Sequence, residues 1–344
     1  MVTTIASPAV HVQFSRISLS WLVRIADMVD PQHRSVPRFM PTKYRASNLR
    51  VRLQALKRAM QRTVYRATRR RPESVAHRWI TPVPDLTDRE ACLFVSYSPD
   101  GTLSDQAQFH LQAWAAQGFA VVLILCTDQP VAYVPGDEVT FCTGVLVRLN
   151  EGYDFAGWAS GVALLPTVKS ARSMVMVNDS IYGPTDRFAA MVTQLRNHPA
   201  DLCGAVESMQ FRPHVQSFLV RFGPRLLRSR AFARFWDGVR IGDRKFVIRT
   251  CELEMARAIG QAGFTIDVLY HPSDEDNPTL TAWRELIDIG FPYVKAQLLR
   301  ENPCDVDLSG WRELLITQGY DPALIDRHRP GATDAADGSR SVRA

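Results

Sequence analysis

Between residues 90 and 206, short apolar runs alternate with longer amphipathic segments, and this alternation constrains the fold more than any other feature. The run from Phe119 to Cys126 is apolar at every position, which is typical of a strand buried on both faces. The expected strands are 91–98, 119–127, 145–149, 173–177 and 202–206, and the expected helices are 103–117, 155–165 and 185–196. This order predicts an α/β fold in which a mostly parallel sheet carries helices on both faces.

The chain outside this region gives weaker signals. Beyond residue 207 we expect strands at 216–222 and 264–270 and helices at 231–239 and 252–262, the last closed by Gly263. Residues 330–344 are rich in Gly, Ala, Asp, Ser and Arg and predict a disordered tail. Pro31, Pro37 and Pro41 interrupt residues 1–43, which predicts a poorly ordered leader.

Positive charge is concentrated before the sheet begins. The chain has a formal net charge of +6, and twelve Lys and Arg lie between Lys43 and Arg78 against Glu73 alone. Without this block the remainder is slightly acidic, so we infer that the positive field belongs to one segment. Apolar residues at three- and four-residue steps predict a basic amphipathic helix within 44–80. It could pack on the protein, rest on an anionic membrane through 47–71, or grip nucleic acid.

Composition and missing motifs exclude several classes of protein. With 46% hydrophobic and 22% charged residues, the chain is neither disordered throughout nor embedded in a membrane. We expect a cytosolic protein, because the first residues show no secretory signal. The six cysteines form no CxxC pair and are expected to be reduced core thiols. The absence of GxGxxG and GxxxxGK[ST] disfavours a dinucleotide site and a P-loop.

Polar residues gather where the predicted strands end, the edge at which such sheets bind ligands. Arg148 can bind a phosphate through two parallel hydrogen bonds, and Asn150 and Asp154 can bind the base or the ribose hydroxyls. Gly152 permits a tight turn or a close approach to a ligand. In the alternative interpretation, Asp154 only caps the helix that follows.

The next strand runs directly into Asn178, Asp179 and Ser180. A carboxylate flanked by short oxygen-bearing side chains suits a divalent ion that bridges a diphosphate. The alternative is an Asx-turn that caps a helix starting near Thr185.

Two later clusters could act on an acceptor. His214 and Gln216 alternate along the start of a predicted strand and could contact an acceptor sugar. Glu252 and Glu254 open a predicted helix, where acidic residues often serve only as partners of the helix dipole. One of these two carboxylates could instead deprotonate an acceptor hydroxyl.

Taken in order, these motifs resemble a known family. The matching stretches are Arg148-x-Asn150-x-Gly152-Tyr-Asp-Phe155, Asn178-Asp-Ser-x-Tyr-Gly-Pro184, His214-x-Gln-Ser-Phe218, Phe235-Trp236, Glu252 with Gly263-Phe264, and Asn277-Pro-Thr279. Together they resemble the rhamnan synthesis protein F family, rhamnosyltransferases of cell-wall and lipopolysaccharide assembly, over roughly residues 90 to 300. More broadly, the pattern resembles inverting GT-A glycosyltransferases, with Asn178-Asp179-Ser180 in the place of their DxD motif and Glu252 in that of their base.

The resemblance implies a division of the chain and a chemistry. A glycosyltransferase domain would span 90–320, with a nucleotide-sugar half at 90–207 and an acceptor half at 208–320. A nucleoside-diphosphate sugar, rhamnose or another deoxysugar, would place its base and ribose near Ser96, Arg148 and Asp154. Asp179 and a divalent cation, Mg or Mn, would hold the diphosphate, with His271 as a further metal ligand.

The resemblance also implies an acceptor and a location. Glu252 would be the base, and the acceptor would be a lipid-linked or polysaccharide glycan at the inner face of the cytoplasmic membrane. A catalytically silent glycan-assembly or binding protein of the same fold is the alternative, since Asn178-Asp-Ser carries one carboxylate where DxD has two. No nucleic-acid partner is expected.

Overall fold

The run that most shaped the sequence analysis forms β3 (Ala120–Thr127), and all eight of its residues are buried. The computed structural model describes residues 64–65, 67–130, 136–274 and 276–328. The predicted leader, residues 44–63 of the predicted basic helix, and the predicted tail lie outside the described residues. Apolar side chains on both sides of β3 require cover on both faces, and the structure provides it.

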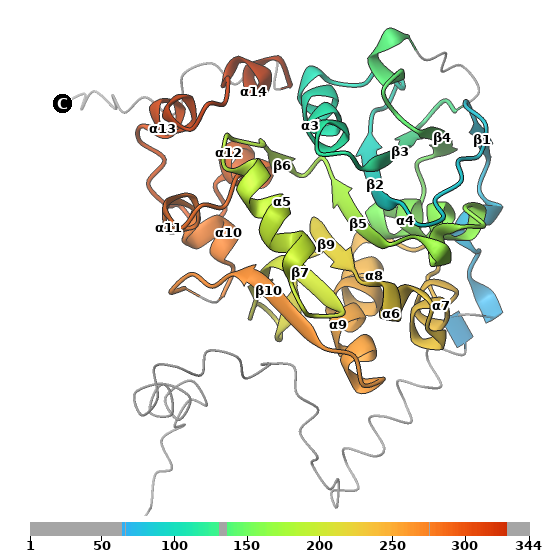
Figure 1. The fold of residues 1–344 in the computed structure, drawn as a ribbon. Helices are drawn as coiled ribbons and strands as arrows, with labels where there is room; N and C mark the ends of the chain where they lie inside the picture. Colours follow the sequence, from blue (N-terminus) through green and yellow to red (C-terminus); the bar gives the residue numbers. More distant parts are fainter. Residues whose placement is uncertain (1–63, 66, 131–135, 275, 329–344) are drawn as a thin grey trace, which may run out of the picture. The chain divides into compact units, whose positions relative to one another are not determined.

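The central sheet has the order β1-β4-β3-β2-β5-β9-β7-β10, and β8 pairs with β7 (Figure 1). Its strands are β1 (His77–Trp79), β2 (Glu90–Tyr97), β3, β4 (Gly144–Leu149), β5 (Ser173–Asn178), β7 (Leu202–Ser208), β8 (His214–Val215), β9 (Leu219–Phe222) and β10 (Ile266–Tyr270). Strands β4, β3, β2 and β5 run parallel, as do β7 and β10. Strands β1 and β9 are antiparallel to their neighbours. The predicted α/β class with a mostly parallel sheet is confirmed.

Strand order creates a switch point between β2 and β5. The chain moves outward from β2 to β3 and β4, and then returns to place β5 on the other side of β2. In open α/β sheets, ligands bind outside the carboxyl ends of the strands at such a reversal. Those ends are Tyr97 in β2 and Asn178 in β5.

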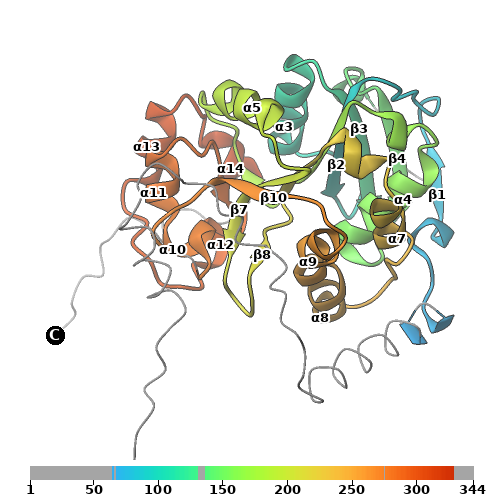
Figure 2. The ribbon, with the colours of Figure 1, turned by 60° about the horizontal axis from the view of Figure 1, so that its bottom comes forward.

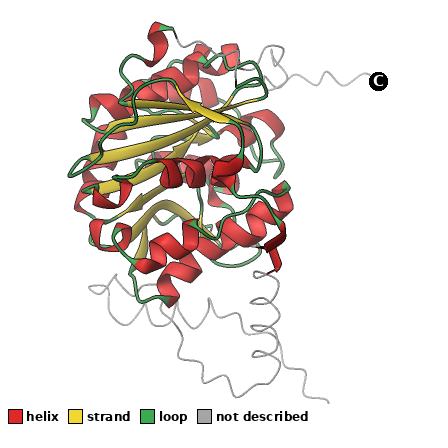
Figure 3. Cartoon of the chain, turned by 90° about the vertical axis from the view of Figure 1, so that its right-hand side faces the viewer, coloured by secondary structure: helices red, strands yellow, loops and turns green. Residues whose placement is uncertain are grey.

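Helices cover both faces of the sheet (Figure 3). One face packs on α4 (Tyr153–Leu164), α6 (Pro224–Leu227), α7 (Arg230–Trp236), α8 (Arg244–Val247), the π-helical turn η4 (Ile248–Glu252) and α9 (Leu253–Gln261). The other face packs mainly on α3 (Asp105–Ala116) and α5 (Phe188–Asn197). Short 3₁₀ turns η1 (Pro72–Ser74), η2 (Asp137–Val139) and η3 (Val168–Ser170) complete the connections.

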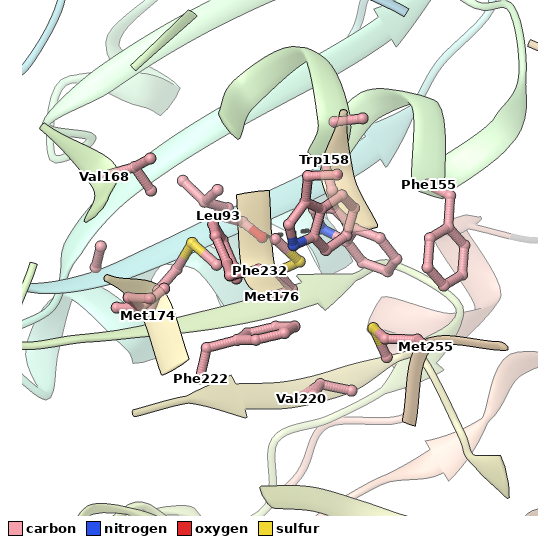
Figure 4. Packing of buried hydrophobic residues seen from close by; sticks show 14 of the residues in the cluster. Leu93, Phe155, Trp158, Val168, Met174, Met176, Val220, Phe222, Phe232 and Met255 are labelled. Carbon is pink, nitrogen blue, oxygen red and sulfur yellow. Dashed lines mark hydrogen bonds between the residues drawn. The ribbon is translucent and has the colours of Figure 1, made fainter. Parts of the chain in front are cut away.

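The two cores follow from the period of two along each strand. In β2, Leu93 and Val95 point to one core, whereas Cys92 and Phe94 point to the other. Trp158 of α4 lies over the first core, and its Nε1 donates to the carbonyl oxygen of Leu93 at 3.2 Å (Figure 4). This bond satisfies a polar group that burial would otherwise leave without a partner.

Local signals set the limits of α3 and α9. The Ser104 side chain accepts a hydrogen bond from the amide of Ala107 and caps the start of α3. Gly118 and Gly263 follow α3 and α9 with φ of +84° and +88°, a left-handed conformation that glycine adopts without strain.

The C-terminal region was less predictable. A ribbon of β6 (Ile181–Tyr182) and β11 (Val294–Lys295) packs with five short helices on a third core. These helices are α10 (Pro278–Thr281), α11 (Trp283–Asp288), α12 (Ala296–Glu301), α13 (Trp311–Thr317) and α14 (Ala323–His328). None of the described helices is long and apolar enough to cross a bilayer.

The sheet extends across two of the residue limits that were used to divide the chain. Strand β1 joins the sheet beside β4, so the sheet begins before residue 90. Strands β9 and β10 belong to the same sheet as β2–β5, so a single sheet crosses the expected boundary at residue 207. The sequence did not predict the edge strand β1, because its three residues show no clear alternation and so give no periodic signal.

Candidate active site

Asp179 links the two strands at the switch point. Its Oδ2 accepts hydrogen bonds from the hydroxyl of Ser96 at 2.7 Å and from the backbone N–H of Tyr97 at 3.0 Å. Ser96 is buried at the end of β2, and Asp179 directly follows β5. The carboxylate is therefore fixed at the edge where a ligand is expected.

Asp154 lies beside this carboxylate. Asn178 Nδ2 donates to Asp154 Oδ2 at 2.6 Å. Burial, and then the negative charge of Asp179, raise the pKa of Asp154 from 3.8 to about 6. Asp154 does not cap α4, because the N-cap position belongs to Gly152. Its side chain instead joins the polar cluster.

Ser180 connects the cluster to a residue that the sequence analysis missed. The Ser180 amide and hydroxyl both donate to Asn178 Oδ1, at 3.2 and 2.6 Å, and so form an Asx-turn. This turn does not cap α5, which starts at Phe188 after β6. Lys295 Nζ donates to the Ser180 hydroxyl at 2.9 Å.

Lys295 is the cation of the cluster. Burial lowers its pKa, and the charges of Glu252, Asp154 and Asp179 oppose that effect. Its ammonium also lies 4.7 Å from the ring centroid of Phe218. The available sequence signal was a lysine set between the apolar residues of 291–294 and Ala296, but nothing in the sequence indicated its partner 115 positions away.

The structure distinguishes the two candidate bases. Glu254 is buried and forms ion pairs with both Arg212 and Arg257. Glu252 is only partly buried, and its Oε1 accepts from the hydroxyl of Ser217 at 3.0 Å. It ends the π-helical turn η4, a distortion that often accompanies functional sites. Of the two carboxylates, Glu252 is the one that forms no ion pair with an arginine in the part of the chain that the structure describes.

These contacts bring together residues that are far apart in sequence. The charges of Asp179 and Glu252 both act on Asp154 and on Lys295. The structure thus assembles Asp154, Asp179 and Glu252 around one lysine at the carboxyl ends of β2 and β5.

Arg148 does not fit its predicted role as a phosphate ligand. Its side chain is fully buried, and it donates to the carbonyl oxygen of Glu151 at 3.0 Å and to Cys126 Sγ at 3.6 Å. Because a guanidinium with no exposed surface cannot meet a ligand without rearrangement, we correct this prediction. Arg148 holds the loop that carries Asn150 and Gly152.

In that loop Gly152 adopts a left-handed conformation, with other parts of the chain close to its Cα. Gly152 has φ of +85°, and a Cβ added there would lie 2.7 Å from Ala156 Cβ and 3.4 Å from Ile241 Cα. The amide of Asn150 donates to the carbonyl oxygen of Thr127 at 2.9 Å. Donor binding by either residue stays a prediction.

His214 and Gln216 are both occupied inside the protein. His214 is buried in β8, and its Nδ1 lies 2.9 Å from the carbonyl oxygen of Arg212. The Gln216 amide donates to Asn277 Oδ1 and accepts from the hydroxyl of Thr279. These bonds tie the start of α10 to the sheet and leave both ends of the Gln216 amide engaged, contrary to its predicted contact with an acceptor.

His271 cannot share a metal ion with Asp179. It is exposed and follows β10, which is separated from β5 by β9 and β7. Three strand spacings of about 4.8 Å each place the two strand ends roughly 14 Å apart. That prediction was wrong because the antiparallel insertion of β9 could not be read from the sequence.

The raised pKa of Asp154 makes stability depend on pH. The folded protein holds more protons than the unfolded chain between pH 3.8 and about 6, so the free energy of unfolding falls as pH rises through that range. From pH 4 to pH 7.5, we expect the free energy of unfolding of Asp154→Asn to rise by about 1–3 kcal/mol relative to that of the parent protein. Urea denaturation at both pH values measures it, with exposed Asp88→Asn as the control. An identical pH dependence in the parent and Asp154→Asn would contradict the prediction.

Comparison with known proteins gives partial matches. The chain is 25% identical over 192 residues to the uncharacterized protein y4gN of Sinorhizobium fredii, covering 54% of this chain and 49% of that protein. The chain thus spans about half the length of that relative. It is 26% identical over 219 residues to the virulence protein VirA of Vibrio anguillarum, covering 53% of this chain and 70% of that protein.

Two solved structures show low similarity. A cytidylyltransferase from Leptospira borgpetersenii has a TM-score of 0.28 and 12% identity, covering 55% of this chain and 79% of that one. Residues 1–349 of S. aureus TarS, in complex with UDP-GlcNAc, have a TM-score of 0.32 and 10% identity, covering 69% and 72%. No assignment rests on these two scores.

The family comparison is more informative. The model of rhamnan synthesis protein F matches residues 137–321, which is more than half of the chain. That range includes Asp154, Asp179, Glu252 and Lys295. The chain belongs to the rhamnan synthesis protein F family.

Proposed function

We propose that this chain is a glycosyltransferase that moves a sugar, rhamnose or another deoxysugar, from a nucleoside-diphosphate donor to a growing surface polysaccharide or lipopolysaccharide glycan. The observation that carries the proposal is the group of Asp154, Asp179, Glu252 and Lys295 at the strand-order switch point. Membership of a family named for rhamnan synthesis supports the same reaction class.

Lys295 and Ser180 form the proposed diphosphate contact. Lys295 lies in β11 of the β6–β11 ribbon, and its ammonium donates to the hydroxyl of Ser180. The charges of Asp154, Asp179 and Glu252 act on this ammonium. A fixed cation at this place stabilises the negative charge that develops on a departing diphosphate. The three carboxylates outnumber this lysine, so a bound diphosphate needs further positive charge.

A divalent cation is compatible with the residues present. No group of three or more His, Cys, Asp or Glu in the described ranges is arranged to hold a metal ion. Mg²⁺, however, commonly binds through one or two carboxylates together with substrate phosphates. Asp179, with Asp154 beside it, offers that donor set, without His271. Such an ion, when bound, would neutralise charge on the diphosphate.

Glu252 is the proposed base. Its carboxylate takes the proton of an acceptor hydroxyl while the hydroxyl oxygen bonds to the anomeric carbon of the donor. The bond from that carbon to the diphosphate oxygen breaks on the opposite side, the nucleoside diphosphate leaves with the electron pair, and the configuration inverts. The hydrogen bond from Ser217 fixes the carboxylate orientation.

A donor screen tests the proposal. The purified chain is incubated with a panel of nucleoside-diphosphate sugars, an acceptor glycan and Mg²⁺ or Mn²⁺, and release of nucleoside diphosphate is measured. We expect release with one donor class and a loss of about 100-fold or more in Asp179→Asn, because the amide would hold the cation that neutralises the diphosphate far more weakly than the carboxylate. Asp88→Asn is the matched control. No release with any donor would support the silent assembly protein instead.

A further inference from the structure

A second basic region lies outside the amphipathic segment. Residues 221–249 contain nine Lys and Arg against only Asp237 and Asp243. The positive field is therefore not confined to one segment, which corrects the inference from charge totals. Arg225 pairs with Asp201 at the amino end of β7. We call the other exposed members of this region the basic face: Arg228, Arg230, Arg234, Arg244, Lys245 and Arg249.

The basic face lies on neighbouring elements. Helix α6 packs on α7, α7 packs on α9, and η4 packs on both α8 and α9. Figures 1 and 2 both place α7 on the side away from α12 and α14. Arg228, Arg230 and Lys245 make no ion pair or side-chain hydrogen bond with any other residue that the structure describes, nor do Arg244 and Arg249. Exposed positive charge on neighbouring elements attracts an anionic partner.

The described end of the amphipathic segment joins this face. The Arg69 guanidinium lies 4.2 Å from the ring centroid of Phe246, and its Nη1 donates to the carbonyl oxygen of Ile241 at 3.2 Å. The amide of Ile241 in turn donates to the carbonyl oxygen of Arg70. The arginine-rich chain thus packs against α8 and extends the same positive surface.

The basic face also borders the candidate active site. The charge of Arg244 acts on Lys295, the cation of that site. Ile241, three residues before α8, lies against Gly152 of the loop that leads to Asp154. A partner bound to this face would therefore lie near the carboxylate cluster.

Apolar groups accompany the charges. A cavity of about 150 Å³ opens between α7, η4 and α9, lined by Ala231, Phe235, Val239, Phe246 and Ala258 among others. A cavity of this size holds a small apolar group such as benzene. The hairpin between β7 and β8 exposes 79% of Phe211 and is fixed to α9 by the ion pair of Arg212 with Glu254. Basic residues combined with exposed aromatic and apolar positions are typical of proteins that lie on a membrane surface.

We propose that the basic face binds the anionic surface of a lipid bilayer and brings the candidate active site close to the headgroups. The charges interact with anionic lipid, and apolar groups around them enter the interface. Membrane binding does not use the carboxylate of Glu252, so it goes beyond the proposed reaction and is tested without a donor.

Vesicle co-sedimentation of the full chain tests the proposal. The test variant is Arg230→Gln/Lys245→Gln/Arg249→Gln, and the control removes the same charge elsewhere as Arg187→Gln/Arg300→Gln/Arg327→Gln. Each basic residue near an anionic surface contributes about fivefold to binding. We expect the test variant to bind phosphatidylglycerol vesicles about 100-fold more weakly, and the control to bind like the parent.

The outcomes separate the possibilities. Neither the parent nor the test variant should bind phosphatidylcholine vesicles appreciably. The Glu252→Gln variant should bind phosphatidylglycerol vesicles like the parent. Equal binding of phosphatidylglycerol vesicles by the test variant and the parent would overturn the proposal. It would also be overturned if, in a parallel assay, the test variant lost binding to duplex DNA or RNA but kept binding to vesicles. Thermal denaturation of all variants confirms that they fold.

Discussion

Replacing Glu252 with glutamine is expected to lower the kcat of sugar transfer by about 10²–10⁴-fold, the range that general base catalysis supplies. The amide keeps the size of the side chain and can still accept from Ser217, but it cannot take a proton. The KM for the donor should change little, because the carboxylate acts on the acceptor hydroxyl. Steady-state release of nucleoside diphosphate measures both constants.

Glu254→Gln separates the base from its neighbour. Glu254 is buried between Arg212 and Arg257, so its loss leaves two arginines without their shared carboxylate. We expect it to destabilise the protein by about 3–5 kcal/mol while the surviving folded molecules retain most of their kcat. Exposed Glu301→Gln is the control for both Glu252→Gln and Glu254→Gln. A Glu252→Gln variant with more than a tenth of the parent kcat would remove Glu252 from the role of base.

Lys295→Met is expected to have the second-largest effect, a loss of about 10²–10³-fold in kcat/KM for the donor. The methionine fills a similar space but leaves Asp154, Asp179 and Glu252 without the cation that faces them. The pKa of Asp154 should rise further, because Lys295 lowers it in the parent protein. Carboxyl chemical shifts of Asp154 across pH give a readout that loss of packing alone would not move.

Exposed Lys169→Met is the matched control for Lys295→Met. Lys295→Arg should keep the charge and recover part of the activity, although a guanidinium differs in shape from an ammonium. If Lys295→Met lowers only the stability, with kcat/KM and the pKa of Asp154 unchanged, Lys295 is a structural residue and the diphosphate contact must be sought elsewhere.

Much of the fold was predictable because its signals are local. Consecutive apolar residues in β3 and the glycines that end α3 and α9 each act over a few residues. The rule that ligands bind where parallel strands end also selected Asp179 and Asp154 correctly as neighbours. The strand β1 and the ribbon of β6 and β11 are two or three residues long and carry too little pattern to be recognised.

Errors in the predicted site arose where residue type was judged without burial. Arg148 suits phosphate by its chemistry, but β4 directs it into the protein toward Cys126. Gln216 suits a sugar, but Asn277 and Thr279 already occupy its amide. His271 follows a strand end as expected, but on the wrong side of β9 and β7.

The sequence by itself determined the α/β class, most strands and helices, and the carboxylates at the strand ends, because each depends on apolar periodicity and turn chemistry within short windows. Only the tertiary structure decided that Lys295 meets Ser180, that Glu254 is neutralised while Glu252 is not, and that residues 221–249 form a charged surface. Such contacts join residues distant along the chain, and long-range pairing and burial fix them rather than local preference.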